Sequence, residues 1–203
     1  MSKTRSNTST VRSITLLAIM IAIVAVMQVI STYVSFGAFK ITLTLVPIVV
    51  GGILLGPSKG AILGAVFGLM VSIFSVTGAD PGGAMVFAAN PAVAWIFCLV
   101  RGAAVGALPA LIYRAIANKN DKAASVVASI CAPVINTGIF IVGMLIFFMP
   151  VFNEWMQLSG YENPLNYLIF GLCGVNFLIE FAVAVVFAPA IALIVKAARR
   201  SLR

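Results

Sequence analysis

The chain has 203 residues, of which 62% are hydrophobic and 9% charged, and its formal net charge is +8. A soluble domain normally carries about 25% charged residues, so too few polar groups are present here to cover a water-facing surface. Composition therefore excludes an ordinary soluble domain and indicates an integral membrane protein. The basic excess does not indicate a partner nucleic acid, because the charges gather at the ends of apolar segments rather than along one face.

Six apolar segments follow one another along the chain. Residues 1–13 form a polar, basic tail, and the apolar run at residues 14–36 has the length of about 20 residues that a membrane-spanning helix needs. We expect this run to be the first of six transmembrane helices. The others are predicted at residues 43–55, 61–76, 91–116, 123–149 and within 164–198. Together they form a single transmembrane domain over residues 14–198, followed by a basic tail at 199–203.

The connections between these segments are short and rich in turn-forming residues. A Gly-Pro turn is expected at residues 56–60 and a polar turn at 117–122. Between the third and fourth spans, residues 77–90 are predicted to form a loop with a partial helix at 84–89. Residues 150–163 are predicted to form a polar loop before the last span. The predicted fold class is an all-α membrane protein with six transmembrane helices and no soluble domain.

Lysine and arginine are divided unevenly between the two sides of this predicted bundle. Of the thirteen basic residues, Lys40 falls on one side, Arg101 falls within a span, and the other eleven fall on the side of the two termini. Cytoplasmic loops of membrane proteins carry the excess of lysine and arginine. The distribution therefore predicts that both termini are cytoplasmic.

Two ionisable residues lie deep within the predicted spans. Arg101 is ten residues past Pro91, which is about 15 Å along a helix that rises 1.5 Å per residue. Glu180 lies near the same depth in the last span. Charges within a bilayer are costly and normally face the bundle interior or a wet cavity. Arg101 and Glu180 either pair with each other or contact a polar ligand, and the sequence leaves both interpretations open.

Asparagine side chains are expected at the same depth. Asn136 and Asn176 lie near the level of Arg101, and Asn176 shares a helix face with Glu180 four residues later. The alternative role is hydrogen bonding between helices, worth about 1 kcal/mol each. We interpret the convergence as a small-molecule site closed by residues 80–83 and 154–161. The predicted substrate-binding residues are Lys40, Asp80, Asn90, Trp95, Arg101, Asn136, Asn176 and Glu180.

The sequence offers no motif for catalysis or for metal binding. It has no histidine and no phosphate-binding loop. The cysteines Cys98, Cys131 and Cys173 lie inside apolar runs without metal-ligand spacing, which favours core packing. We therefore expect that the protein is not an enzyme, uses no cofactor or metal, and does not hydrolyse ATP itself.

Small residues recur every four positions on three of the predicted helices. The rows are Ala18 and Ala22; Gly60, Gly64 and Gly68; and Gly102 and Gly106. Such rows let helix backbones approach closely. We expect the glycine rows to pack helices within the chain. Ala18 and Ala22 either do the same or form a docking face for another membrane protein.

Three motifs of this six-span chain resemble the substrate-binding S components of energy-coupling factor (ECF) vitamin transporters. They are Ala18-x-x-x-Ala22, Leu45-x-Pro47 and Gly52-x-x-x-Gly56-Pro57-x-x-Gly60. In that family the S component lies in the plasma membrane of a prokaryote, surrounded by membrane lipid, and binds a vitamin from outside. It docks through small residues of its first helix on a transmembrane coupling subunit, and two cytoplasmic ATPase subunits drive release inside. The resemblance implies that Ala18 and Ala22 are the docking face and that the ligand binds in the outer half, among helices four to six.

The polar residues of the predicted site bear on the identity of the vitamin. Lys40 and Arg101 suit a carboxylate. Few aromatic residues are predicted near the outer mouth, namely Phe87, Trp95, Trp155, Tyr161 and Tyr167. Because a large flat ring is usually held between aromatic side chains, the sequence favours pantothenate, a small flexible hydroxy-amide acid. Riboflavin, folate or another nutrient are the alternatives within the family, and a small channel or a scaffold subunit is the alternative of another class.

Overall fold

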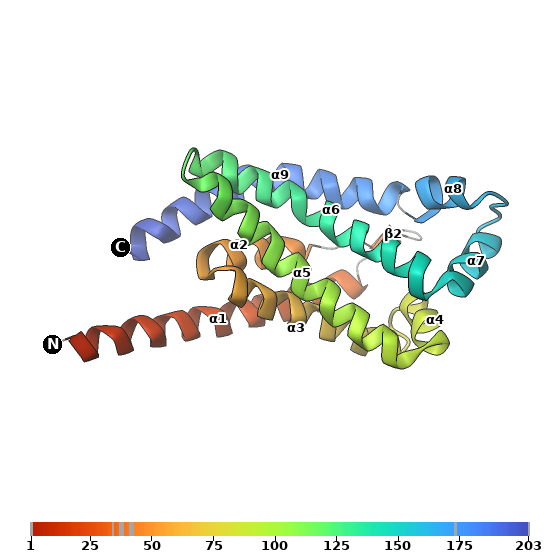
Figure 1. Ribbon diagram of the computed structural model, residues 1–203, viewed down its shortest axis with the longest axis horizontal. Helices are drawn as coiled ribbons and strands as arrows, with labels where there is room; N and C mark the ends of the chain where they lie inside the picture. The colour runs from red at the N-terminus through yellow and green to blue at the C-terminus, as the bar shows by residue number, and fades with distance from the viewer. Residues whose placement is uncertain (1, 34, 37–38, 41–42, 173, 203) are drawn as a thin grey trace.

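The computed structural model describes residues 2–33, 35–36, 39–40, 43–172 and 174–202, and the side chains of residues 11–33, 43–171 and 177–198. Long helices run side by side along one axis (Figure 1). In chain order the elements are α1 (Ser2–Tyr33), β1 (Ser35–Phe36), β2 (Phe39–Lys40), α2 (Leu45–Leu55), α3 (Pro57–Val76), α4 (Pro81–Ala89), α5 (Pro91–Ala117), α6 (Asp121–Phe147), α7 (Met149–Leu158), α8 (Pro164–Asn166), the π-helix η1 (Tyr167–Leu172) and α9 (Gly174–Leu202). The two short strands pair antiparallel, and the rest of the described secondary structure is helical.

Among the described residues, five helices are long and apolar enough to cross a membrane. These segments are Val11–Tyr33, Pro57–Val76, Pro91–Ala117, Asp121–Phe147 and Phe177–Ala198. The remaining predicted span, the second at residues 43–55, corresponds to α2, which has only 11 residues. Eleven residues span about 16 Å of a hydrocarbon layer about 30 Å thick. The two chain ends lie at one end of the bundle, hereafter the terminal end, while α4 and α7 lie at the opposite end, the α4–α7 end (Figure 1).

Several predicted element boundaries were wrong. Residues 150–163, predicted as a loop, contain most of α7, and the partial helix predicted at 84–89 begins earlier, in α4. Both helices have a proline in their first turn, where its missing N–H would lack a helical partner in any case. The predicted turn at 56–60 is reduced to Gly56, whose φ of 95° suits glycine. At the start of the chain, α1 extends through most of the segment predicted as a polar tail.

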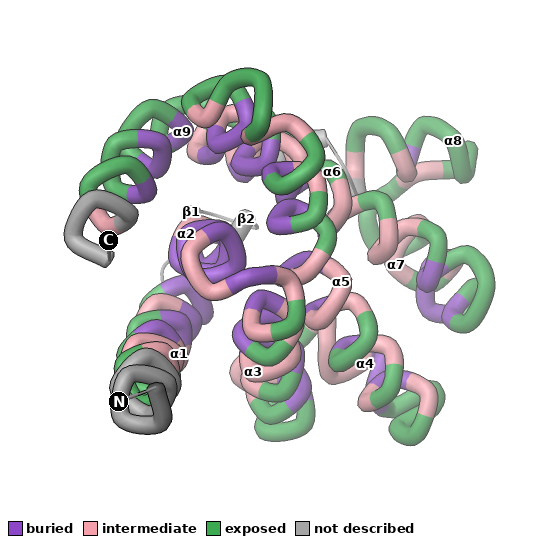
Figure 2. Tube along the Cα trace, turned by 60° about the vertical axis from the view of Figure 1, so that its left-hand side comes forward, coloured by how far each residue is buried: buried purple, intermediate pink, exposed green. Residues whose placement is uncertain are grey.

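The 11-residue helix α2 is the most enclosed of the apolar helices. Eight of its eleven residues are buried, and it contacts α1, α3, α5, α6 and α9. In Figure 2 it is largely purple, between α1, α3 and α9. Because α2 carries no polar side chain, it can be surrounded by other helices without leaving a polar group unpaired. It therefore forms the centre of the apolar core at the terminal end.

Glycine brings α3 and α5 into direct backbone contact. A Cβ atom added at Gly64 would lie 1.9 Å from the carbonyl oxygen of Gly102, and one added at Gly60 would lie 2.2 Å from that of Gly106. No side chain fits in these positions while the helices stay where they are. The prediction that the glycine rows pack helices within the chain is confirmed.

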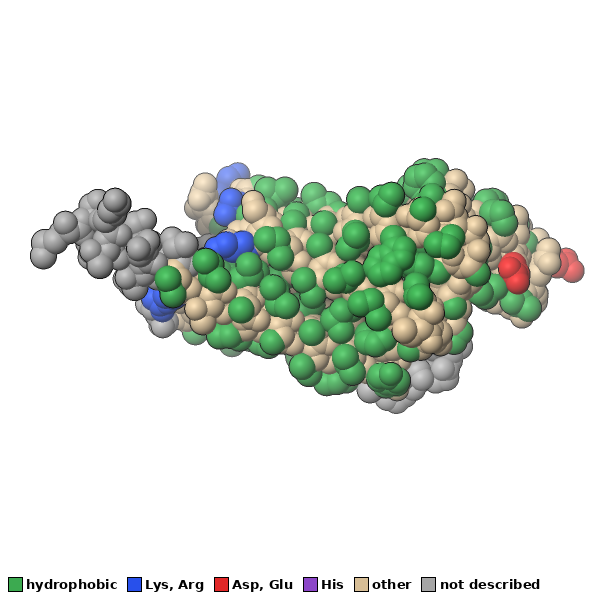
Figure 3. All heavy atoms as spheres, turned by 90° about the horizontal axis from the view of Figure 1, so that it is seen from below, with side chains coloured by type: hydrophobic (Ala, Val, Ile, Leu, Met, Phe, Trp, Pro, Cys, Tyr) green, Lys and Arg blue, Asp and Glu red, His purple; other side chains and the backbone are tan. Residues whose placement is uncertain are grey.

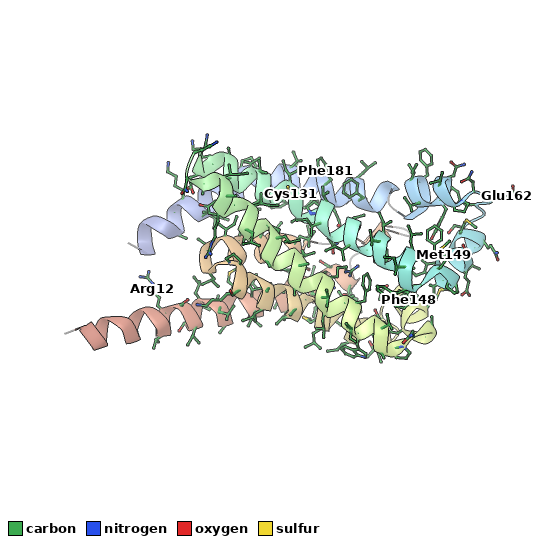
Figure 4. The ribbon with its side chains drawn as sticks, in the orientation of Figure 1. Arg12, Cys131, Phe148, Met149, Glu162 and Phe181 are labelled. Carbon is green, nitrogen blue, oxygen red and sulfur yellow. The ribbon has the colours of Figure 1, made fainter. Side chains whose placement is uncertain are left out.

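Charged residues divide between the two ends of the bundle. Figure 3 shows lysine and arginine side chains near the terminal end, acidic side chains at the α4–α7 end, and a mainly hydrophobic surface between them. Figure 4 places Arg12 and Glu162 toward these opposite ends. A hydrophobic belt between charged ends is the surface expected of a bundle that crosses a bilayer.

We expect Gly64→Ala to lower the stability of the fold. The methyl group would meet the backbone of Gly102, so α3 and α5 must separate, which we expect to cost about 1–3 kcal/mol, the range of overpacked cores. Thermal unfolding of the purified protein in detergent measures this loss. Gly138→Ala on α6 is the control, since no atom lies within 4 Å of its added Cβ and alanine favours the helix. Equal unfolding temperatures for the two variants would contradict the assignment.

Candidate functional site

A cavity of about 580 Å³ lies among the helices. This volume falls within the range of about 300–1,000 Å³ that is typical of small-molecule sites. Its walls come from α1, α3, α4, α5, α6, α7 and α9, and its polar lining comprises Gln28, Ser31, Thr32, Ser75, Asp80, Arg101, Asn136, Thr137 and Glu180. Across the described residues, Cys, Asp and Glu form no group of three or more that could hold a metal ion. The chemistry that this lining offers is hydrogen bonding and charge.

The cavity brings together half of the predicted substrate-binding residues. Asp80, Arg101, Asn136 and Glu180 all line it, although they come from different parts of the chain. The two segments expected to close the site also contribute, residues 80–83 at the start of α4 and Trp155 of α7. Trp155 Nε1 donates a hydrogen bond to the Met85 sulfur at 3.0 Å, which joins α7 to α4 at this end of the cavity.

Asn90 and Trp95 do not belong to this lining. Asn90 accepts a hydrogen bond from Val93 N at 3.2 Å and so caps the start of α5. Trp95 packs edge-on against Phe87, with ring centroids 5.7 Å apart. The side chains of Lys40 and Asn176 lie outside the described residues.

Arg101 is held by aromatic rings. Its guanidinium carbon lies 5.8 Å from the centroid of Phe97 and 5.2 Å from that of Phe140, contacts worth about 0.5–2 kcal/mol each. Arg101 Nε is buried and has no hydrogen-bond partner among the described residues. An unpaired buried donor costs about 1–3 kcal/mol. The guanidinium therefore lies in the cavity wall, and its Nε–H group is not used in a hydrogen bond with the described residues.

Asn136 of α6 and Glu180 of α9 face each other. Asn136 Nδ2 donates to Glu180 Oε2 at 3.5 Å, and the two residues are 8% and 5% exposed. In this contact the amide nitrogen of Asn136 is the donor and the carboxyl oxygen of Glu180 is the acceptor. Asn136 Oδ1 is then left buried without a partner in the described part of the chain. The cavity wall thus holds an unsatisfied acceptor as well as an unsatisfied donor.

More aromatic side chains line the cavity than the sequence predicts. Six phenylalanines and one tryptophan line the cavity: Phe67, Phe74, Phe87, Phe97, Phe140, Phe177 and Trp155. Only Phe87 and Trp155 had been expected near the site, because the others lie within the spans rather than at their outer ends. On α3, Phe67, Val71 and Phe74 recur at helical spacing and share one face. Such a face cannot be told from ordinary core by its sequence.

The first helix also contributes a polar wall that had not been expected. Gln28, Ser31 and Thr32 line the cavity and are 7%, 5% and 9% exposed. Their spacing of i, i+3 and i+4 places them on one face of α1. Three hydrogen-bonding side chains on one face of an otherwise apolar span are the signal that could have located this wall.

Comparison with known proteins identifies the family of this cavity-bearing bundle. A family profile described as "ECF transporter, substrate-specific component" matches residues 12–192. The chain belongs to this family. It is also 26% identical, over 189 residues, to the pantothenic acid transporter PanT of Lactococcus lactis subsp. cremoris (strain MG1363), covering 88% of this chain and 90% of that protein. The resemblance inferred from the sequence motifs is confirmed, and the chain is a multi-pass membrane protein of a transporter family.

We expect the stability effects of Arg101→Met and Glu180→Gln to be additive. Arg101 lies against Phe97 and Phe140, whereas Glu180 accepts a hydrogen bond from Asn136 at 3.5 Å. If the effects are additive, the stability lost in the double variant equals the sum of the two single losses within about 0.5 kcal/mol. Thermal unfolding of the three variants in detergent tests this. If the single variants were destabilised and the double variant restored, Arg101 and Glu180 would instead be a structural pair.

Proposed function

We propose that this protein is the substrate-binding subunit for pantothenate, or a closely related hydroxy-amide carboxylate, in an ECF-type importer. The observation that carries the proposal is the Arg101 guanidinium, which lies in the cavity wall against two rings and has an unpaired buried Nε. A guanidinium suits a carboxylate because its donors match the two oxygens. The similarity to PanT, whose name gives pantothenic acid as its cargo, supports the same substrate class.

The aromatic lining supports a second candidate substrate within the same family. Seven aromatic side chains surround the cavity, and such a wall suits the flat ring of a vitamin such as riboflavin through stacking. The same rings also suit the two methyl groups of pantothenate by apolar contact. Direct binding measurements separate the two candidates.

Calorimetric titration of the purified protein with pantothenate, riboflavin and folate tests the substrate. We expect stoichiometric binding of pantothenate, weakened about 10- to 150-fold by Arg101→Met, because a charge-assisted hydrogen bond is worth about 1.5–3 kcal/mol. Arg101→Lys should recover only part of this loss, since the planar fork is absent. Lys196→Met, an exposed change near the terminal end, should bind like wild type. Binding of riboflavin in place of pantothenate would overturn the assignment.

We propose further that the loaded protein docks on a transmembrane coupling subunit driven by two cytoplasmic ATPases. Ala18 and Ala22 are exposed and lie one turn apart on α1, so another helix could approach closely there. We expect Ala22→Trp to retain substrate binding in detergent and to abolish uptake in cells. Leu193→Trp, at an exposed position on α9, is the matched control and should leave both intact. Normal uptake by the Ala22→Trp variant would place the docking face elsewhere.

We also propose six membrane crossings, with α2 as the second and both termini in the cytoplasm. Support comes from the two chain ends lying at one end of the bundle (Figure 1) and from the basic residues near that end. An impermeant thiol reagent added outside intact cells should label Gly160→Cys and spare Asn120→Cys, with the unmodified chain as the blank. Labelling of Asn120→Cys alone would reverse the orientation.

A further inference from the structure

A chain of hydrogen bonds joins the polar wall of α1 to the start of α2. Leu43 N donates to Ser31 Oγ at 3.2 Å, Ser31 Oγ lies 3.4 Å from Thr44 Oγ1, and Thr44 Oγ1 donates to Gln28 Oε1 at 2.9 Å. Gln28 and Ser31 line the cavity, whereas Thr44 is fully buried and does not belong to the lining. Thr44 therefore contacts the side chains of the wall from outside the cavity.

The direction of this chain follows from the number of hydrogens available. A hydroxyl group has one hydrogen, and Thr44 donates its own to Gln28, so Ser31 must be the donor in the Ser31–Thr44 contact. The chain therefore runs from the Leu43 backbone to the Gln28 amide oxygen, and each bond polarises the next.

We propose that Thr44 is a positioning residue that acts on the substrate through Gln28. By holding Gln28 Oε1, Thr44 leaves the Gln28 amide nitrogen as the group that α1 presents to the cavity, where it donates to an oxygen of the substrate. This inference rests on the proposed function, in that the substrate is taken to be an oxygen-rich carboxylate. Gln28 then favours ligands that carry an acceptor at this position over analogues that carry a donor or a methyl group.

Binding of pantothenate to four variants tests the proposal. Thr44→Val keeps the shape of the side chain but removes the hydroxyl, and we expect it to weaken binding about 5- to 10-fold, the value of one hydrogen bond. Thr44→Ser keeps the hydroxyl and should restore nearly all of the affinity. Gln28→Leu should weaken binding at least as much as Thr44→Val. In the double variant, Thr44→Val should cost nothing further, because Thr44 acts only through Gln28.

A purely structural role for Thr44 makes a different forecast. Thr44→Val would then lower the unfolding temperature without changing the dissociation constant, or would weaken binding equally with and without Gln28. Either result overturns the proposal. Ser72→Ala is the control for loss of a buried hydroxyl, because Ser72 is fully buried, donates to Gly68 O of its own helix and is outside the cavity lining. It should leave the affinity unchanged.

A second measurement is independent of the ligand. The chain has two glutamines, Gln28 and Gln157, so ¹⁵N labelling of glutamine side chains gives two amide signals, and Gln28→Leu identifies the first. In the ligand-free protein, Thr44→Val should shift or broaden the Gln28 signal and leave that of Gln157 unchanged. An unchanged Gln28 signal overturns the proposal. If the signal depends on Thr44 but the wild type does not bind pantothenate, the substrate assignment fails and the positioning role stands.

Discussion

The backbone contact between α3 and α5 fixes the geometry on which the cavity depends. Gly60 and Gly64 bring the two helices together along the half of the bundle nearer the terminal end, and Gly68 continues the row to Cys98. From the level of Gly68 onward, side chains of α3 line the cavity together with Phe97 and Arg101 of α5, namely Phe67, Val71, Phe74 and Ser75. The row of glycines thus ends where the cavity begins. Close packing in one half and an open interior in the other follow from the size of the residues on a single pair of helices.

The interior of the cavity combines a mainly aromatic wall with a small number of fixed polar groups. Arg101 lies against two rings, and its buried Nε has no hydrogen-bond partner among the described residues, so its charge is held in position while this donor is unused. On the facing helices, Asn136 is oriented by Glu180, and on α1 the Gln28 amide is oriented by Thr44. Each polar group therefore has a neighbour that determines which of its atoms remains available. Preorganised groups of this kind lower the ordering cost of binding.

Much of this architecture could be predicted from the sequence, and the errors have identifiable causes. Long apolar runs predicted α3, α5 and α6 because bilayer thickness dictates their length, and depth counting brought Arg101, Asn136 and Glu180 to one level. Depth gives no information about the rotation of a helix about its axis, so the wall formed by α1 was missed. α7 was missed because its polar residues resemble those of a loop.

Asn90 has a local role in the structure. Asn90 comes directly before Pro91, where its side chain can either cap a helix or contact a ligand. In the structure it caps α5, since a local backbone donor is available without any ligand. The aromatic wall could not be distinguished from core packing, because a buried phenylalanine that faces a cavity and one that faces another helix have the same spacing. Local rules therefore accounted for the elements and their ends, whereas the cavity depended on which faces met.

The enclosure of α2 has a consequence for how the protein fits its membrane. Transmembrane helices that face lipid must match the thickness of the hydrocarbon layer, and a mismatch is met by tilting or by deforming the bilayer. None of the eleven residues of α2 is exposed, so its length is set by the helices around it and not by lipid. A thicker or thinner bilayer therefore acts on the outer helices, which can tilt or lengthen around a core of constant length.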